Sequence, residues 1–262
     1  MKAIILAAGK GTRLNKYTQE LPKGMLHIFG KPLIQHQVDT YLRNGITDIT
    51  IVKGYCSEKI DIPGTKSYFN PLYAETNMVE SLFYAENEIF GDVIISYSDV
   101  LFEDKTLQTV MKSKNDIGVL IDKDWKDYWK ARYGKVDFDT ESLRINSSGK
   151  IYELGISDPP LNEIDGRYVG MIRLSEKGSE IFKSTYNKGK KEFYGKPWLN
   201  NRFFEKIFMT DFLQEIINQN NSVFPIEITR GWLEFDTNED YELSVKWEKE
   251  KTLHNFFKFY SK

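Results

Sequence analysis

The chain has 262 residues, with 36 Lys and Arg against 38 Asp and Glu, and a formal net charge of −2. This near-neutral balance argues against a general nucleic-acid binder or membrane-surface binder. The single cysteine, Cys56, excludes an intramolecular disulfide and fits a reducing cytoplasm. No apolar stretch approaches the about 20 residues of a membrane-spanning helix, and the N-terminus lacks the pattern of a signal peptide. We therefore expect a cytoplasmic protein that binds neither nucleic acid nor membrane.

The first predicted element is a buried strand over residues 1–6, and the loop after it is the most informative segment. That loop runs Leu6-Ala7-Ala8-Gly9-Lys10-Gly11-Thr12-Arg13-Leu14. Its small residues let backbone N–H groups approach a polyanion closely. Arg13 and the later Lys23 supply cations suited to phosphate oxygens. The strand, the loop and the two cations predict a nucleoside triphosphate site.

Two better-known glycine loops fit this segment less well, and an ordinary tight turn is the simplest alternative. A P-loop needs four residues between its glycines and then Gly-Lys-Ser/Thr, a spacing that is absent here. A dinucleotide-binding loop needs a third glycine, where this chain has Leu14, and an acid at the end of the second strand. The second predicted strand is instead followed by Lys53, Gly54 and Tyr55.

The first half of the chain alternates predicted strands and helices. Strands are expected over residues 48–52, 66–69, 93–97 and 117–121, and helices over 31–45, 77–89 and 104–112. Pro32 is expected in the first turn of the first helix, and Gly45 at its end. This order predicts a mixed, mostly parallel central sheet flanked by helices.

The second half begins with a predicted embellishment at about residues 122–166, a small antiparallel β-arm. Short strands are expected there over residues 135–138, 143–145 and 151–154, with a turn at 146–149. Beyond the arm we expect strands over 168–174, 224–228 and 232–235, and helices over 175–186, 203–218 and 238–249. No flexible linker is apparent, so residues 1–262 are interpreted as a single domain with an aromatic tail at 256–260.

Two aspartates distant in the sequence are candidate metal ligands. Asp99 follows the strand predicted over residues 93–97, and Asp236 follows the strand predicted over 232–235. Ligands bind beyond the carboxyl ends of parallel strands, so Asp99 should share an edge with the glycine loop, and Asp236 joins them if its strand reaches that edge. Magnesium prefers one or two carboxylates together with phosphate oxygens. The alternatives are a turn-capping Asp99 and an Asp236 that caps the helix near Asn238.

The loop, together with Pro22-Lys23, resembles the signature L-A-A-G-x-G-[ST]-R-[LFM] and P-K of the sugar-phosphate and phosphocholine-type nucleotidyltransferases. The resemblance implies the Rossmann-like nucleotidyltransferase fold and a magnesium-dependent enzyme. It implies catalytic roles for Lys23, Arg13, Asp99 and Asp236, with Asp99 and Asp236 holding Mg²⁺. Glu234 and Asp240 match the family's late acidic segment and are expected to support the metal ligands. The nucleotide-binding residues it implies are Leu6, Ala7, Ala8, Gly9, Lys10, Gly11, Thr12, Arg13, Lys23 and Asp99.

A second resemblance points to CTP. Asn77 and Ser81 match the N-x-x-x-S-L element of phosphocholine and phosphonate cytidylyltransferases and would read the base from one helix face. Helix capping by Asn77 and a surface role for Ser81 are the alternatives. A hexose-1-phosphate nucleotidylyltransferase using dTTP or UTP, and a non-catalytic nucleotide-binding regulatory subunit, also stay open. The presence of Lys23 and both aspartates favours the enzyme.

The acceptor is expected to be a phosphorylated small molecule. The resemblance favours phosphoglutamine, with phosphocholine or a phosphonate next, in capsule polysaccharide biosynthesis. Candidate acceptor-binding residues are Lys196, Trp198, Arg167 and Trp129, because cations can bind an acidic group and aromatic faces can hold a quaternary ammonium. Packing roles for the tryptophans and surface roles for the cations are the alternatives. The aromatic tail is compatible with a homodimer.

Overall fold

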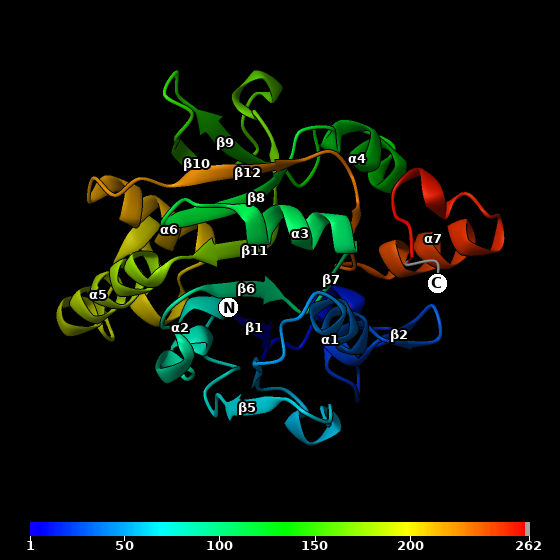
Figure 1. The fold of residues 1–262 in the computed structure, drawn as a ribbon, viewed down its shortest axis with the longest axis horizontal. Coiled ribbons are helices and arrows are strands. Elements are labelled where there is room, and N and C mark those ends of the chain that lie inside the picture. Colours follow the sequence, from blue (N-terminus) through cyan, green and yellow to red (C-terminus); the bar gives the residue numbers. More distant parts are fainter. Residues whose placement is uncertain (260–262) are drawn as a thin grey trace.

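The computed structural model describes residues 1–259, which form a mixed α/β fold around one central sheet (Figure 1). In the described residues this sheet has seven strands in the order β12-β8-β11-β6-β1-β4-β5. They are β1 (Lys2–Ala7), β4 (Ile49–Lys53), β5 (Lys66–Phe69), β6 (Val93–Tyr97), β8 (Ile117–Asp122), β11 (Arg167–Leu174) and β12 (Phe224–Ile228). Only β11 runs antiparallel to its neighbours within this sheet. The expected mixed, mostly parallel sheet is confirmed.

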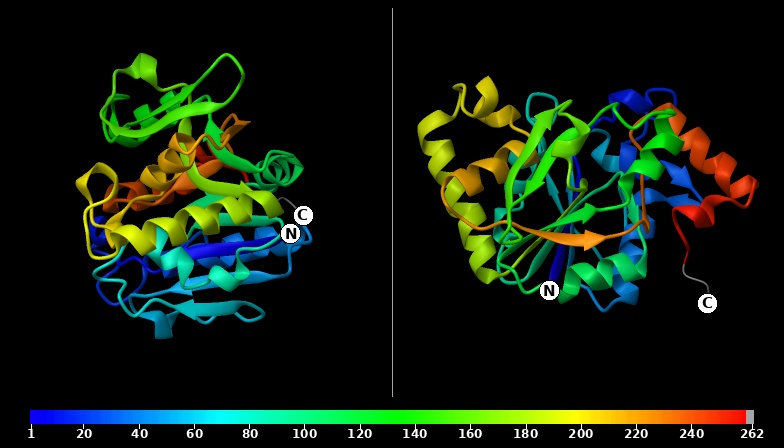
Figure 2. Two further views of the ribbon diagram at one scale, coloured as in Figure 1. Left: turned by 90° about the vertical axis from the view of Figure 1, so that its left-hand side faces the viewer. Right: turned by 90° about the horizontal axis from the view of Figure 1, so that it is seen from above.

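Helices cover both faces of the sheet (Figure 2). They are α1 (Leu33–Arg43), α2 (Met78–Phe83), α3 (Asp104–Lys112), α4 (Trp125–Tyr133), α5 (Glu176–Phe193), α6 (Met209–Asn218) and α7 (Asn238–Lys249). One core contains side chains of α1, α3, α4 and α7, and the other contains those of α2, α5 and α6. Strand β1 contributes side chains to both cores. Ala3 and Ile5 belong to the first core, and Ile4 and Leu6 belong to the second. This period of two is what a central strand buried on both faces requires.

The predicted antiparallel arm is present as β9 (Glu141–Ile145) and β10 (Ile151–Ser157), which project beyond the β12 edge of the sheet (Figures 1 and 2). The strand expected over residues 135–138 is wrong. Helix α4, which the sequence did not predict, ends at Tyr133 just before this segment, and Gly134 caps it in a left-handed conformation with φ of 74°. Asp139 turns the chain again with φ of 50°. No regular ladder can pass through two such turns.

Several helix boundaries differ from expectation. The helix expected over residues 77–89 ends at Phe83, and the one expected over 203–218 begins only at Met209. Pro32 precedes α1 and pairs in the short hairpin of β2 (His27–Ile28) and β3 (Lys31–Pro32). The cap of α7 is Thr237, and not Asp236, with the Thr237 hydroxyl 3.2 Å from the Asp240 amide nitrogen. The helix capped by Ser175 extends beyond residue 186 to Phe193.

A two-stranded ribbon outside the central sheet connects the two predicted metal ligands. Strand β13 (Trp232–Glu234) pairs antiparallel with β7 (Val100–Phe102), a strand that the sequence reading missed. Since β7 directly follows Asp99, the pairing brings residue 236 back to that position. The amide of Phe235 donates to the Asp99 carbonyl at 3.0 Å. Asp236 therefore reaches the sheet edge through this ribbon, and not through a strand of the central sheet.

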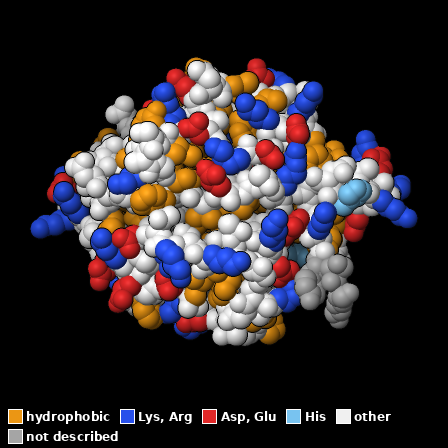
Figure 3. Space-filling model, turned by 45° about the horizontal axis from the view of Figure 1, so that its top comes forward, with side chains coloured by type: hydrophobic (Ala, Val, Ile, Leu, Met, Phe, Trp, Pro, Cys, Tyr) orange, Lys and Arg blue, Asp and Glu red, His pale blue; other side chains and the backbone are white. Residues whose placement is uncertain are grey.

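Part of the expected aromatic tail packs against α7. Phe256 packs on Trp247 with ring centroids 4.7 Å apart, while Tyr260 of the expected aromatic tail lies outside the described residues. Acidic and basic side chains are intermixed over the face in Figure 3, as the small net charge predicts. Among the described helices, none has the length and apolar character needed to cross a bilayer.

Leu233, in the middle of β13, is fully buried and tests how much the ribbon depends on core packing. We expect Leu233→Ala to lower the free energy of unfolding by about 2–5 kcal/mol, because it removes buried methyl groups and leaves a cavity. Val245→Ala on α7 is the control, since its side chain is 39% exposed and its loss should cost well under about 1 kcal/mol. Urea denaturation compares them. Equal losses would contradict a tightly packed ribbon.

Candidate active site

The glycine loop borders a cavity of about 180 Å³ at the carboxyl ends of β1 and β6. The cavity collects most of the predicted nucleotide-binding residues. Its lining consists of Leu6, Ala8, Gly9, Gly11, Lys23, Tyr73, Thr76, Asn77, Met78, Ser81, Tyr97, Ser98 and Asp99. Ala7, Lys10, Thr12 and Arg13 belong to the same loop but do not line the cavity. Tyr73, Thr76, Met78, Tyr97 and Ser98 were not predicted, although Tyr97 and Ser98 directly precede Asp99.

Two glycines explain how Lys23 reaches this cavity. Gly11 has a left-handed φ of +67°, and a Cβ there would lie 3.0 Å from the Cβ of Lys23. Gly24 lies so close to α1 and to the residue after β6 that its Cβ would be 2.5 Å from Ile34 and 3.0 Å from Ser98. Both positions therefore favour glycine, and together they fix the path of the Lys23 side chain.

The ammonium of Lys23 lies between the two predicted metal ligands. Its Nζ donates to Asp99 Oδ2 and to Asp236 Oδ1. All three side chains are largely buried, with 12%, 17% and 14% of Lys23, Asp99 and Asp236 exposed. Burial disfavours the charge on Lys23, but the two carboxylates outweigh this and raise the pKa of Lys23 above its ordinary value. Asp236 behaves conversely: burial opposes its charge, yet Lys23 and Arg13 hold its pKa below the ordinary value.

Arg13 connects this centre to the β-arm. Its Nη2 donates to Asp236 Oδ2 at 2.7 Å, and its Nη1 donates to Asp139 Oδ2 at 3.3 Å. The Arg13 side chain is 56% exposed, so these contacts are open to exchange with a ligand. Asp139 was not predicted as a site residue. It contacts Arg13 only because the chain after α4 folds back toward the glycine loop.

Behind Asp236, a buried arginine from α4 organises the start of α7. Arg132 forms a bidentate pair with Asp240, with Nε–Oδ1 and Nη2–Oδ2 distances of 2.8 Å each, and its side chain is 1% exposed. Its Nη1 also donates to Glu234 Oε2 at 2.5 Å. The same Asp240 carboxylate accepts from the amides of Asp236 and Thr237 at 2.9 Å. Arg132 therefore holds the backbone that carries Asp236, as the support role expected for Glu234 and Asp240 requires.

The centre has the donor chemistry of a magnesium site. Asp99 Oδ1 is buried and makes no hydrogen bond, so one carboxylate oxygen at the centre is left without a partner. Burial raises the pKa of Glu234 to about 7, against the opposing charge of Arg132. No group of three or more His, Cys, Asp or Glu residues suited to a metal occurs in residues 1–259. Two carboxylates with an unused oxygen fit an ion that takes its remaining ligands from phosphates and water.

The two predicted base-reading residues both line the cavity, but each already has a structural contact. Asn77 caps α2, with its Oδ1 accepting from the Met78 amide at 2.8 Å. Ser81 is buried, and its hydroxyl accepts from Asn70 Nδ2 at 2.9 Å. The side-chain amide of Asn77 also donates from Nδ2 to the Lys206 carbonyl at 3.4 Å. Contact of Asn77 and Ser81 with a base stays a prediction.

The predicted acceptor residues do not form one cluster. Trp129 is fully buried, and the Arg167 guanidinium lies 4.2 Å from its ring centroid, so the ring supports Arg167 and offers no open face. Trp198 stacks on Phe193 and Phe204, with centroids 5.8 and 5.3 Å away. Lys196 is exposed in the loop between α5 and α6. Among these four residues, Arg167 is linked to the centre through Asp139. Its Nη1 donates to the Asp139 carbonyl at 3.1 Å, and the Asp139 carboxylate contacts Arg13.

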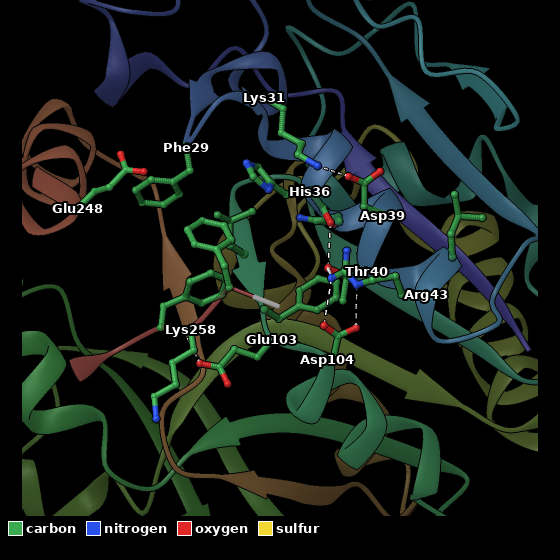
Figure 4. A pocket seen from close by; sticks show the side chains of 16 residues that line it. Phe29, Lys31, His36, Asp39, Thr40, Arg43, Glu103, Asp104, Glu248 and Lys258 are labelled. Carbon is green, nitrogen blue, oxygen red and sulfur yellow. Dashed lines mark hydrogen bonds and ion pairs between the residues drawn. The ribbon is translucent and has the colours of Figure 1, made fainter. Parts of the chain in front are cut away.

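A larger cavity of about 570 Å³ lies beside α1 and residues 257–259 (Figure 4). Its charged groups mainly neutralise one another: Lys31 pairs with Asp39, and Arg43 pairs with Asp104 at 3.1 Å. Glu103 accepts from the Lys258 amide at 2.7 Å. Size therefore does not identify the active site, whereas the smaller cavity combines the glycine loop with Lys23 and Asp99.

Comparisons with known proteins show which family the chain is similar to. The model of the nucleotidyl transferase family matches residues 2–151. A CTP:phosphoglutamine cytidylyltransferase of Campylobacter jejuni is 30% identical, covering 94% of this chain and 100% of the relative. A choline-phosphate cytidylyltransferase of Streptococcus pneumoniae is 32% identical over 62% of this chain and 72% of its own.

Solved structures share the fold. A CTP:phosphocholine cytidylyltransferase from Streptococcus pneumoniae has a TM-score of 0.71 at 23% identity, covering 95% of this chain and 98% of that one. An inositol-1-phosphate CTP transferase from T. maritima has a TM-score of 0.69 at 19% identity, covering 98% of each chain. The Rossmann-like nucleotidyltransferase fold implied by the sequence is thus confirmed.

The bidentate pair of Arg132 with Asp240, called here the Arg132 clamp, should contribute to the stability of the fold. Arg132→Met should lower the free energy of unfolding by about 3–5 kcal/mol, because Asp240 would keep a buried charge without its partner. The control is Arg144→Met on the arm, where the nearest carboxylates lie 3.8 and 4.0 Å away and the side chain is 37% exposed. That change should cost about 0–1 kcal/mol. A chemical denaturation series in which both variants match the parent chain would argue against the clamp.

Proposed function

We propose that this chain, which belongs to the nucleotidyl transferase family, is a cytidylyltransferase. It would condense CTP with a phosphorylated small molecule to give a CDP-linked product and pyrophosphate. The observation that carries this proposal is the convergence of Lys23, Asp99 and Asp236 beside the glycine-loop cavity. Phosphoglutamine is our first candidate acceptor, since the relative named for it aligns over 94% of this chain. Phosphocholine and phosphonates come next.

The chemistry needs alignment and charge stabilisation more than proton transfer. An oxygen of the acceptor phosphate, already anionic near neutral pH, attacks the α-phosphorus of CTP, and the bond to the bridging oxygen of the β-phosphate breaks. Lys23 would stabilise the charge that develops at the α-phosphate. The Gly9–Gly11 segment and Arg13 would hold the β- and γ-phosphates. Arg13 is suited to this because its guanidinium is exposed and can exchange Asp236 for phosphate.

Asp99 and Asp236 would hold Mg²⁺. When bound there, the ion would neutralise charge on the triphosphate and on the departing pyrophosphate. The unpartnered Asp99 Oδ1 is the observation that supports a further cation at this point. Lys23, which lies between the same carboxylates, would then turn its ammonium toward the phosphates.

The other candidate functions make different demands. A hexose-1-phosphate nucleotidylyltransferase using dTTP or UTP shares the glycine loop, but the N-x-x-x-S-L element at Asn77 favours CTP. A non-catalytic regulatory subunit would not need the charged centre to be intact, and here Lys23, Asp99 and Asp236 are all in contact. We also propose a cytoplasmic location and a role in capsule polysaccharide biosynthesis. The homodimer stays a prediction.

A screen for pyrophosphate release tests the assignment. CTP, UTP and dTTP are each combined with phosphoglutamine, phosphocholine, a phosphonate and glucose-1-phosphate. We expect release with CTP and a non-sugar acceptor. Release only with UTP or dTTP and glucose-1-phosphate would support the sugar enzyme, and no release with any pair would support the regulatory subunit.

Lys23→Ala should lower kcat by about 10²–10³-fold, because it removes the charge that stabilises the α-phosphate in the transition state. Circular dichroism should show an unchanged fold. Lys16→Ala is the matched control, since Lys16 pairs with Glu242 on the surface and is 62% exposed. Unchanged turnover of the Lys23 variant would remove this residue from the mechanism.

Removal of divalent cations should abolish turnover. After treatment with EDTA we expect no pyrophosphate release above background, and full recovery when Mg²⁺ is added in excess. Asp99→Asn and Asp236→Asn should each raise the Mg²⁺ concentration needed for half-maximal rate. A metal-independent rate, or an unaltered Mg²⁺ requirement in both variants, would contradict the assignment of these carboxylates.

A further inference from the structure

Two side chains of opposite charge at the base of the β-arm have hydrogen-bonding groups without partners in residues 1–259. Glu141, the first residue of β9, is half-buried, and its carboxylate makes no hydrogen bond or ion pair within residues 1–259. Arg167, the first residue of β11, donates from Nη1 to a backbone carbonyl only, at 3.1 Å. Its Nε is buried without any hydrogen-bond partner in that same part of the chain. Half-buried charges without partners are costly, so each favours a ligand of opposite charge.

Both residues are connected to the catalytic centre. The carbonyl that Arg167 contacts belongs to Asp139, whose carboxylate contacts Arg13 at 3.3 Å, and Glu141 follows two residues later. Tyr168 directly follows Arg167 in β11, and its hydroxyl lies 3.4 Å from that of Tyr97, which lines the glycine-loop cavity.

The surroundings hold Arg167 in place without neutralising it. The ring of Trp129 backs its guanidinium at 4.2 Å, and Trp129 is itself fixed by donating from Nε1 to the Phe138 carbonyl at 2.7 Å. Burial raises the pKa of Glu141, and the positive charges of Arg167 and Arg202 act to lower it, but neither arginine forms an ion pair with Glu141 in residues 1–259. A ligand that carries both a cation and an anion would satisfy the two together.

We propose that Glu141 and Arg167 recognise the amino-acid part of a zwitterionic phosphorylated acceptor, with Glu141 binding its ammonium group and Arg167 its carboxylate. This inference rests on the proposed cytidylyltransferase function and selects among its acceptors. Phosphoglutamine carries both charges. Phosphocholine has no carboxylate for Arg167, and its quaternary ammonium has no N–H to donate to Glu141.

The test measures steady-state kinetics of the full-length chain with CTP and Mg²⁺. The acceptors are phosphoglutamine, its N-acetyl derivative, which lacks the ammonium charge, and phosphocholine. We expect Glu141→Gln and Arg167→Met each to raise KM for phosphoglutamine about 10–100-fold, with KM for CTP unchanged, because each removes a charged hydrogen bond. With the N-acetyl derivative, the parent chain and Glu141→Gln should have equal KM values, while Arg167→Met should still differ from both.

Control variants separate recognition from folding. Glu163→Gln removes an acid from the same arm, where Glu163 pairs with Arg144 at 3.8 Å, and should leave all KM values unchanged. Glu141→Asp keeps the charge and should fall between Gln and the parent chain. Loss of CTP binding in both Glu141 variants would make Glu141 a structural residue and would overturn the proposal.

The outcomes distinguish this inference from the function on which it rests. Turnover of CTP with phosphocholine but not with phosphoglutamine would overturn the zwitterion proposal and leave the cytidylyltransferase intact. Unchanged KM for phosphoglutamine in Glu141→Gln and Arg167→Met would do the same. Absence of turnover with every nucleotide and acceptor would overturn both.

Discussion

Two carboxylates that are largely buried and face each other repel unless a cation lies between them. In this chain Asp99 and Asp236 meet that condition through the ammonium of Lys23, which donates to both. Arg13 adds a second cation on the outer side of Asp236. Without ligands, Lys23 and Arg13 thus keep the two aspartates in the positions at which they would bind a divalent ion next to a triphosphate. Exchange of one set of charges for the other is the physical basis of the proposed site.

Convergence of the two aspartates depends on elements outside the central sheet. The β7–β13 ribbon returns the chain to Asp99, and the Arg132–Asp240 pair then fixes the backbone of Asp236. Arg132 comes from α4, at the start of the segment that also forms the β-arm. Asp139 on that segment touches Arg13. The segment after α4 therefore reaches the proposed catalytic centre through Asp139, and it carries Glu141 two residues later.

The sequence predicted what local chemistry determines. Apolar runs located most strands of the central sheet, and the small residues of the glycine loop predict a triphosphate site, which stays a prediction. Residues whose roles depend on pairing across the fold were harder to find: β7 is three residues long, too short for a periodic signal. Helix α4 did carry a periodic signal, because its buried residues follow helical spacing: Trp125, Tyr128, Trp129 and Arg132. Its aromatic residues instead suggested a cage for a ligand. Burial of Trp129 and the position of Glu141 depend on how the arm folds back, which local patterns do not encode.

The most direct measurement of the charge exchange is a crystal structure of the chain with CTP and Mg²⁺. The account predicts one ion bound to oxygens of both Asp99 and Asp236, with the Lys23 ammonium turned away from them to the α-phosphate. An ion bound elsewhere, with Lys23 still between the two carboxylates and the triphosphate outside the glycine loop, would contradict it.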